Sequence, residues 1–305
     1  MKRAIITGPT GSVGTALIKE LISHKIEVLA ITRKDSKRNA NIIADDLVSI
    51  KYCSIDELES LQNDTGKEYD VFYHFAWEGT TGASRNDMYM QNRNVKHALD
   101  AVEVAKRFGC KTFIGAGSQA EYGRVEGLLK PETLANPEMG YGYAKLCAGL
   151  MTREHAHQLG LNHIWVRILS IYGPNDGAQS MVMSTINKLK NNEVAQFTKG
   201  EQMWDYLYSG DAAKAFYLLG KESLINSSID GKTYVLGSGN ARPLADYINE
   251  IKEVVNPEGQ IDLGAIPYSD KQVMYLCADI QELVKDINFK PEMSFKDGIK
   301  SIMSI

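Results

Sequence analysis

This sequence of 305 residues contains little of what marks several common classes of protein. It has only 4 cysteines, none in a CxxC pair or at metal-ligand spacing, so a disulfide framework and a metal site are not expected. No apolar run approaches the ~20 residues that cross a bilayer. The net charge of -4 argues against nucleic-acid binding. We expect a cytoplasmic globular protein with reduced, buried cysteines and neither a membrane nor a nucleic-acid partner.

The first half of the chain alternates short apolar segments with segments of helical periodicity. The strand-like segments lie at 4–7, 27–32, 47–53, 70–76, 111–116 and 163–168. The helical segments lie at 12–24, 86–108 and 141–159. A repeated strand–helix pattern requires right-handed crossovers and gives a parallel sheet with helices on both faces. We therefore predict a doubly wound α/β fold of the Rossmann type over residues 1–174, with later segments returning to it.

The alternation weakens after about residue 175. Segments 180–190, 210–220 and 244–255 have helical periodicity, and 233–236 has the pattern of a strand. Open α/β sheets bind their ligands at the carboxyl edge of the strands. We predict that residues 175–305 form mainly a smaller α/β lobe at that edge, which binds the substrate.

Three glycines, Gly8, Gly11 and Gly14, are spaced as GxxGxxG between the first predicted strand and the first predicted helix. Glycine here permits a tight turn, a close approach of the backbone to a phosphate, and close packing of the helix on the strand. The N-terminus of the helix then offers free N–H groups to a pyrophosphate. This position in the chain favours a dinucleotide site over a purely structural turn. The expected contacts in the turn are Gly8, Thr10, Gly11, Ser12, Val13 and Gly14.

The end of the second predicted strand bears on which dinucleotide is bound. An NAD site usually has a carboxylate there, which binds the 2′-hydroxyl of the ribose. This chain instead has Arg33 and Lys34, followed by Lys37 and Arg38. Because cations attract a 2′-phosphate, we predict NADP, with NAD as the alternative, and contacts from Arg33, Lys34 and Arg38. A solvated basic loop is the competing interpretation.

A tyrosine and a lysine, Tyr141 and Lys145, are four residues apart and therefore share one face of a predicted helix. A phenol with the usual pKa of ~10 transfers protons poorly near neutrality, and a neighbouring ammonium together with the positive charge of an oxidised nicotinamide is expected to lower that pKa. A surface helix pair is the competing interpretation of this spacing. Ser118 follows the fifth predicted strand, so we expect its hydroxyl near the reacting centre, where it can bind a substrate oxygen.

Together these motifs resemble those of the extended short-chain dehydrogenase/reductases, in the group of nucleotide-sugar epimerases, dehydratases and reductases. The segments that follow the family's order and approximate spacing are the glycine turn, HFA at 74–76, SQAEYG at 118–123, YxxxK at 141–145, IYGP at 171–174 and WDYLYSGD at 204–211. The resemblance covers essentially the whole chain. It implies an enzyme that acts on a nucleotide-sugar.

The resemblance also implies roles for individual residues. In a Ser118–Tyr141–Lys145 triad, Tyr141 is the acid/base, Lys145 tunes it and binds the cofactor ribose, and Ser118 anchors the substrate oxygen. The further cofactor contacts that it implies are Ser54, Ile55, Phe75, Ala76, Asn94, Tyr141, Lys145 and Ile168. The substrate contacts that it implies are Trp77, Ser118, Gln119, Tyr141, Ser170 and Trp204. The helices that carry Asn94 and Tyr141 commonly form a homodimer interface in such proteins.

Departures from the family's pattern narrow the reaction. Dehydratases of this group carry an Asp-Glu pair directly after the catalytic hydroxyl, whereas this chain has Gln-Ala at 119–120, which does not titrate, so dehydration is not expected. We expect Glu121 either to contact the substrate or to be a solvated carboxylate. Trp204 replaces the usual arginine near the nucleotide phosphates and either stacks on the substrate or belongs to the core. Diphosphate recognition is then expected from other groups, such as Lys199 or Arg242.

These residues leave three functions open. The favoured prediction is a reductase that uses NADPH, with Tyr141 as proton donor to a 4-keto-6-deoxysugar. The alternative is a nucleotide-sugar 4-epimerase with tightly bound NAD. A cofactor-sensing protein without turnover is disfavoured, because a sensor does not need a proton-transfer set.

Overall fold

The computed structural model describes residues 1–304 and has a parallel sheet of seven strands at its centre. These strands are β1 (Arg3–Thr7), β2 (Glu27–Thr32), β3 (Val48–Tyr52), β4 (Val71–His74), β5 (Thr112–Ser118), β6 (Asn162–Ile168) and β11 (Thr233–Leu236). Their order across the sheet is β11-β6-β5-β4-β1-β2-β3. The chain therefore winds outward in both directions from the β1/β4 pair, which is the switch point where such sheets bind ligands.

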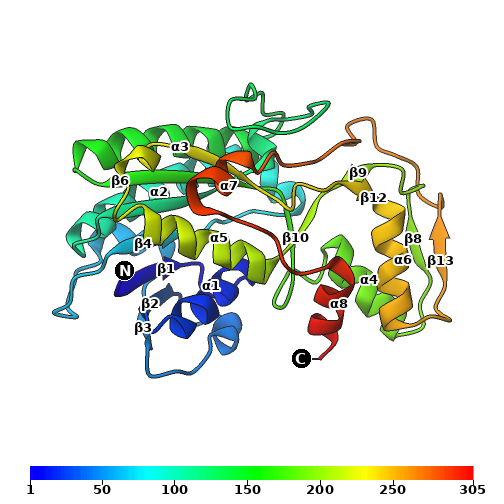
Figure 1. The fold of residues 1–305 in the computed structure, drawn as a ribbon, viewed down its shortest axis with the longest axis horizontal. Helices are drawn as coiled ribbons and strands as arrows, with labels where there is room; N and C mark the ends of the chain where they lie inside the picture. The colour runs from blue at the N-terminus through cyan, green and yellow to red at the C-terminus, as the bar shows by residue number, and fades with distance from the viewer. Residues whose placement is uncertain (305) are drawn as a thin grey trace.

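Helices cover both faces of the sheet (Figure 1). On one face lie α1 (Ser12–Ser23), α5 (Ser209–Glu222) and α7 (Gln281–Ile287), and on the other lie α2 (Met88–Arg107) and α3 (Gly140–Gln158). Strand β1 shows why both faces are needed: Ala4 and Ile6 belong to the core beneath α1 and α5, while Ile5 belongs to the core beneath α2. A strand that is apolar on both sides is stable only between two layers of helices.

A smaller lobe lies beside the sheet, at the right of Figure 1. Its elements are α4 (Met181–Lys190), β8 (Ala195–Phe197), α6 (Leu244–Val255), β13 (Ile261–Leu263) and α8 (Phe295–Met303). The three helices share a core that includes Ile186, Tyr247 and Phe295. Two short strand pairs accompany the lobe: β7 (Ser170–Tyr172) with β10 (Tyr206–Tyr208), and β9 (Met203–Trp204) with β12 (Arg242–Pro243). The predicted fold class, a doubly wound sheet with a smaller α/β lobe, is confirmed.

The remaining elements are short 3-10 turns: η1 (Lys37–Asn41), η2 (Ile55–Ser60), η3 (Gly82–Asn86), η4 (Gln119–Glu121) and η5 (Ser227–Ile229). One prediction about the cysteines is wrong, because Cys147 is exposed on α3 and Cys53 is only half-buried. Within residues 1–304, no helix is long and apolar enough to span a bilayer. The division of the chain near residue 174 stays a prediction.

Candidate active site

The glycine turn between β1 and α1 leaves room against its backbone. Gly8 has φ +69°, a conformation that favours glycine. A Cβ on Gly14 would lie 2.3 Å from the Gly8 carbonyl oxygen, so only glycine lets α1 approach the turn. A Cβ on Gly11 would meet only that same oxygen, at 3.9 Å, among the described atoms. The N-cap residue of α1, Gly11, provides no side-chain cap to the first N–H groups of the helix.

A cavity of about 620 Å³ lies along this turn and the carboxyl ends of β2, β3 and β4. Of the predicted cofactor contacts, its lining includes Gly8, Thr10, Gly11, Arg33, Arg38, Ile55, Phe75 and Ala76. The predicted contacts outside this lining are Ser12, Val13, Gly14, Lys34, Ser54, Asn94, Tyr141, Lys145 and Ile168. Residues that the sequence analysis missed also line it: Thr32, Ser36, Cys53, Glu78, Gly79 and Thr80. Their position just after β2, β3 and β4 is the signal that could have identified them.

The basic loop after β2 is held in a defined conformation. The side chain of Asn39 accepts a hydrogen bond from Thr32 Oγ1 (2.8 Å) and donates one to the carbonyl of Arg33 (2.8 Å). Arg38 donates to the carbonyls of Thr10 (3.2 Å) and Asn175 (2.9 Å), so it joins the glycine turn to the loop after β7. Arg33 and Lys34 are both exposed, but only Arg33 lines the cavity, from a braced loop.

The loop after β4 is fixed by two buried side chains of α2. Asn94 donates to the carbonyl of Glu78 (2.9 Å) and accepts from its N–H (3.0 Å). Gln91 accepts from Trp77 Nε1 (2.9 Å) and donates to the carbonyl of Gly79 (2.9 Å). Both side chains are nearly inaccessible to solvent. Asn94 therefore holds the backbone of a loop that lines the cavity.

Tyr141, Lys145 and Ser118 come together beside Trp77, which is itself part of the cavity lining. Lys145 Nζ donates to the carbonyl of Ala116 (2.6 Å) and lies 3.7 Å from the centre of the Trp77 ring and 5.8 Å from that of Tyr141. Burial lowers the pKa of Lys145 to about 7. Tyr141 and Lys145, two of the predicted catalytic residues, thus adjoin the cavity through Trp77.

The protein's own groups, taken together, raise the pKa of Tyr141. Burial raises the pKa of Tyr141, although a hydrogen bond with Ser118 and the charge of Arg85 act in the opposite direction. The guanidinium carbon of Arg85 lies 4.7 Å from the centre of the Tyr141 ring. Lys145 Nζ contacts the Ala116 carbonyl and the Trp77 ring and lies 5.8 Å from the centre of the Tyr141 ring. The phenol is consequently protonated near neutral pH.

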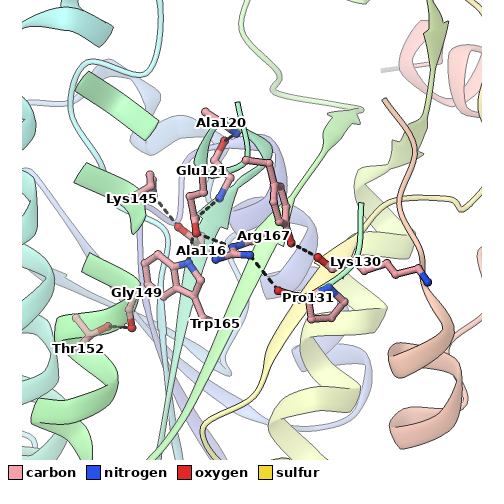
Figure 2. A network of polar contacts seen from close by, with 12 residues as sticks. Ala116, Ala120, Glu121, Lys130, Pro131, Lys145, Gly149, Thr152, Trp165 and Arg167 are labelled. Carbon is pink, nitrogen blue, oxygen red and sulfur yellow. Dashed lines mark hydrogen bonds and ion pairs between the residues drawn. The ribbon is translucent and has the colours of Figure 1, made fainter. Parts of the chain in front are cut away.

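Neither expectation for Glu121 is correct. Its side chain is fully buried and forms an ion pair with Arg167, with 2.7 Å between Oε2 and Nε (Figure 2). Sequence alone could not show this, because the partners of the carboxylate, Trp165 and Arg167, come 44 and 46 residues later. Glu121 is therefore a structural neighbour of Ser118 and not a solvated group.

The predicted substrate residues of the second half lie close to one another. Trp204 Nε1 donates to Ser170 Oγ (2.8 Å), which links β9 to β7. Trp204 is half-buried and packs against two apolar cores. Arg242, its partner across the β12/β9 pair, is held by Glu250 (2.6 Å), while Lys199 is exposed. No cluster of His, Cys, Asp and Glu suited to a metal ion occurs in the described part of the chain.

Comparisons with known proteins agree with this geometry. The model of the NAD dependent epimerase/dehydratase family matches residues 4–237. A CDP-abequose synthase from Salmonella typhimurium is 23% identical over 98% of this chain and 96% of its own. A dTDP-4-dehydro-6-deoxyglucose reductase from Escherichia coli is 24% identical over 98% and 96%. The crystal structure of a UDP-glucuronic acid 4-epimerase from Bacillus cereus in complex with NAD, 18% identical, superimposes with a TM-score of 0.83 over 99% of both chains.

Proposed function

This chain belongs to the NAD dependent epimerase/dehydratase family, and from that premise we propose that it reduces a nucleotide-linked 4-keto-6-deoxysugar. One observation carries the proposal: Ser118, Tyr141 and Lys145 adjoin the cavity at the carboxyl edge of the sheet, while residues 119–120 offer no acid or base for dehydration. The Escherichia coli relative, a dTDP-4-dehydro-6-deoxyglucose reductase, supports the same reaction class.

The cavity has the features that a nicotinamide dinucleotide requires. The open space against Gly11 and the uncapped start of α1 suit a pyrophosphate. Ser12 Oγ, at the start of α1, is buried and has no hydrogen-bond partner among residues 1–304, although Ser12 lies outside the lining of this cavity. Apolar Ile55 and Phe75 and the backbone after β4 would hold the rest of the dinucleotide. When bound, a reduced nicotinamide supplies the hydride.

In the proposed reaction Tyr141 gives a proton to the carbonyl oxygen of the sugar. Its raised pKa keeps that proton in place until the substrate oxygen gains negative charge. Ser118 Oγ accepts from the Ala120 N–H (3.2 Å), which leaves its own hydrogen for Tyr141 or the substrate oxygen. The ammonium of Lys145 stabilises the phenolate that remains. Trp77 shields this group from water on one side.

NADP is our preferred cofactor, because Arg33 lines the cavity at the end of β2 where a 2′-phosphate is expected. Arg38 lines it too and is already oriented by Thr10 and Asn175. The NAD bound to the Bacillus cereus relative favours the alternative.

A 4-epimerase with tightly held NAD is the second candidate, favoured by the identity of that same relative. It oxidises C4 of the sugar, rotates the keto-sugar and returns the hydride. Arg33 and Arg38 in the cavity lining, which suit an exchangeable NADPH, support our preference for reduction.

Identification of the nucleotide in the purified protein tests the choice. A protein that is purified without nucleotide, and that NADPH protects against thermal unfolding more than NADH does, supports the reductase. Stoichiometric NAD⁺ retained through purification would contradict it and favour the epimerase.

Replacing Tyr141→Phe tests catalysis itself. We expect turnover to fall by about 10² to 10⁴, because the proton donor is lost, while cofactor binding is retained. The measurements are the rate of keto-sugar reduction and the thermal shift caused by NADPH. Unchanged biological function of the variant would favour the cofactor-sensing alternative.

We also infer a homodimer formed through α2 and α3. These helices lie side by side and expose several large apolar side chains: Met88, Tyr89, Tyr143, Leu150 and Met151. Contiguous exposed apolar side chains of this size mark interaction surfaces.

A further inference from the structure

Glu121 is a buried carboxylate three residues after Ser118 in the candidate active site. It ends η4, the turn that follows Ser118, and none of its surface is exposed. Its Oε1 accepts from the backbone N–H of Ser118 (2.8 Å) and from Trp165 Nε1 (3.0 Å), and its Oε2 accepts from Arg167 Nε (2.7 Å). Figure 2 shows Glu121 beside Trp165 and Arg167.

The partner of this carboxylate is itself held on several sides. The Arg167 side chain is only 9% exposed, and its Nη1 donates to the carbonyl of Pro131 (3.3 Å). Its guanidinium carbon lies 4.4 Å from the centre of the Tyr122 ring, and the Tyr122 hydroxyl donates to the carbonyl of Lys130 (2.7 Å). A buried ion pair contributes little net free energy to folding, because desolvation of both charges offsets their attraction. Its location suggests another role.

The segment that Glu121 holds carries two contacts of the reacting group. Ser118 presents its hydroxyl toward Tyr141, and the Ala116 carbonyl accepts from Lys145 Nζ. A Cβ on Gly117, between them, would lie 2.5 Å from Glu121 Oε1, so the carboxylate rests against this strand. Ser118 and Glu121 form a reciprocal cap, because Ser118 Oγ accepts from the Ala120 N–H while Glu121 accepts from the Ser118 N–H.

We propose that Glu121, held by Arg167 and Trp165, is a positioning residue that fixes the Ser118 hydroxyl for proton transfer at Tyr141. This inference rests on the proposed function. It assigns the buried carboxylate to catalysis through Ser118, with no contact of its own to the substrate. A displacement of about 1 Å at a reacting group costs about a hundredfold in rate.

Two variants test the inference. E121Q keeps an oxygen that can accept from Ser118 and Trp165, but its amide nitrogen then faces the Nε–H donor of Arg167; we expect kcat to fall about tenfold. The double variant E121M/R167M keeps the volume and removes both charges, so it should fold, yet Ser118 loses its acceptor. For it we expect kcat to fall about a hundredfold with KM changed less than about threefold.

Asp286→Asn is the matched control. Asp286 is a nearly buried carboxylate that accepts from Lys232 (2.6 Å) and Tyr234 (2.6 Å), near the start of β11 and therefore at the end of the sheet away from Ser118. The Asp286→Asn substitution should lower the melting temperature of the protein and leave its kcat unchanged. Glu121 variants that fold and keep the wild-type kcat would overturn the inference. If the double variant does not fold, E121Q alone decides.

Hydrogen exchange at the Ser118 amide separates this inference from the proposed function. Exchange at that amide should accelerate at least tenfold in the double variant, or in E121Q if that is the only folded one, and stay unchanged in the control. Unchanged exchange overturns the inference even if the wild type reduces keto-sugars. If the variant exchanges faster but the wild type reduces no keto-sugar, Glu121 still fixes Ser118. Only the proposed reaction is then rejected.

Discussion

At the scale of single residues, the charge of Lys145 is the property most open to pH. Burial lowers its pKa to about 7, so the ammonium is present below that pH and is lost as the pH rises. If the charge stabilises the Tyr141 phenolate, kcat/KM should decline above about pH 7, because this parameter reports the free enzyme. A pH profile of kcat/KM, measured for reduction of the keto-sugar substrate, checks this. Constant kcat/KM up to pH 9 would show that the charge is not needed.

Arg33 offers a second residue-scale prediction. Arg33→Ser should weaken NADPH binding about tenfold to a hundredfold, because a hydrogen-bonded charge pair with the 2′-phosphate is lost, and should leave NADH binding unchanged. Lys34→Ser is the matched control, since Lys34 is its exposed neighbour outside the cavity lining. Equal losses for the two cofactors, measured by calorimetry, would contradict the assignment.

At the scale of elements, two glycines of the same turn should respond in opposite ways to alanine. A Cβ on Gly14 would collide with the Gly8 carbonyl oxygen at 2.3 Å, so Gly14→Ala should destabilise the fold by about 1–3 kcal/mol. Gly11 has φ -82° and open space around it, so Gly11→Ala should fold normally.

The new methyl group in Gly11→Ala would instead occupy the space expected for the pyrophosphate. Cofactor binding should therefore be lost in this variant while the melting temperature without cofactor stays near that of the wild type. The opposite pattern, with Gly11→Ala unfolded and Gly14→Ala stable, would show that the turn serves packing only.

Helices and strands whose apolar residues recur with a clear period were predictable from the sequence. The helix expected over 86–108 is α2, Met88–Arg107, and the strands expected at 27–32 and 233–236 have those bounds. Strands β9 and β12 have only two residues each and therefore no period to detect. The candidate site divides in the same way: the glycine turn and Tyr141 follow local patterns, whereas the burial of Glu121 depends on the pairing of β5 with β6. That pairing sets Gly117 beside Arg167, and the sequence of neither strand alone predicts it.

At the scale of the whole molecule, the proposed dimer makes a direct prediction. Leu150, half-exposed on α3, should be buried between two copies, so Leu150→Glu should give a monomer by placing a charge in an apolar interface. Leu134→Glu is the control, because Leu134 is 82% exposed in a loop outside both helices. Sedimentation or light scattering distinguishes the outcomes. A wild type that is monomeric at micromolar concentration would contradict the dimer.

The path of the chain through the sheet also bears on how the protein is synthesised. β6 ends at Ile168, but its outer neighbour β11 begins only at Thr233. Helix α4 and strand β8 of the smaller lobe, and helix α5, come between them in the chain. While the ribosome adds the intervening residues, the nascent chain carries β6 as an open, apolar edge. Unpaired strand edges of this kind recruit other chains. The interval between the two strands is thus the period of synthesis in which β6 lacks its outer partner.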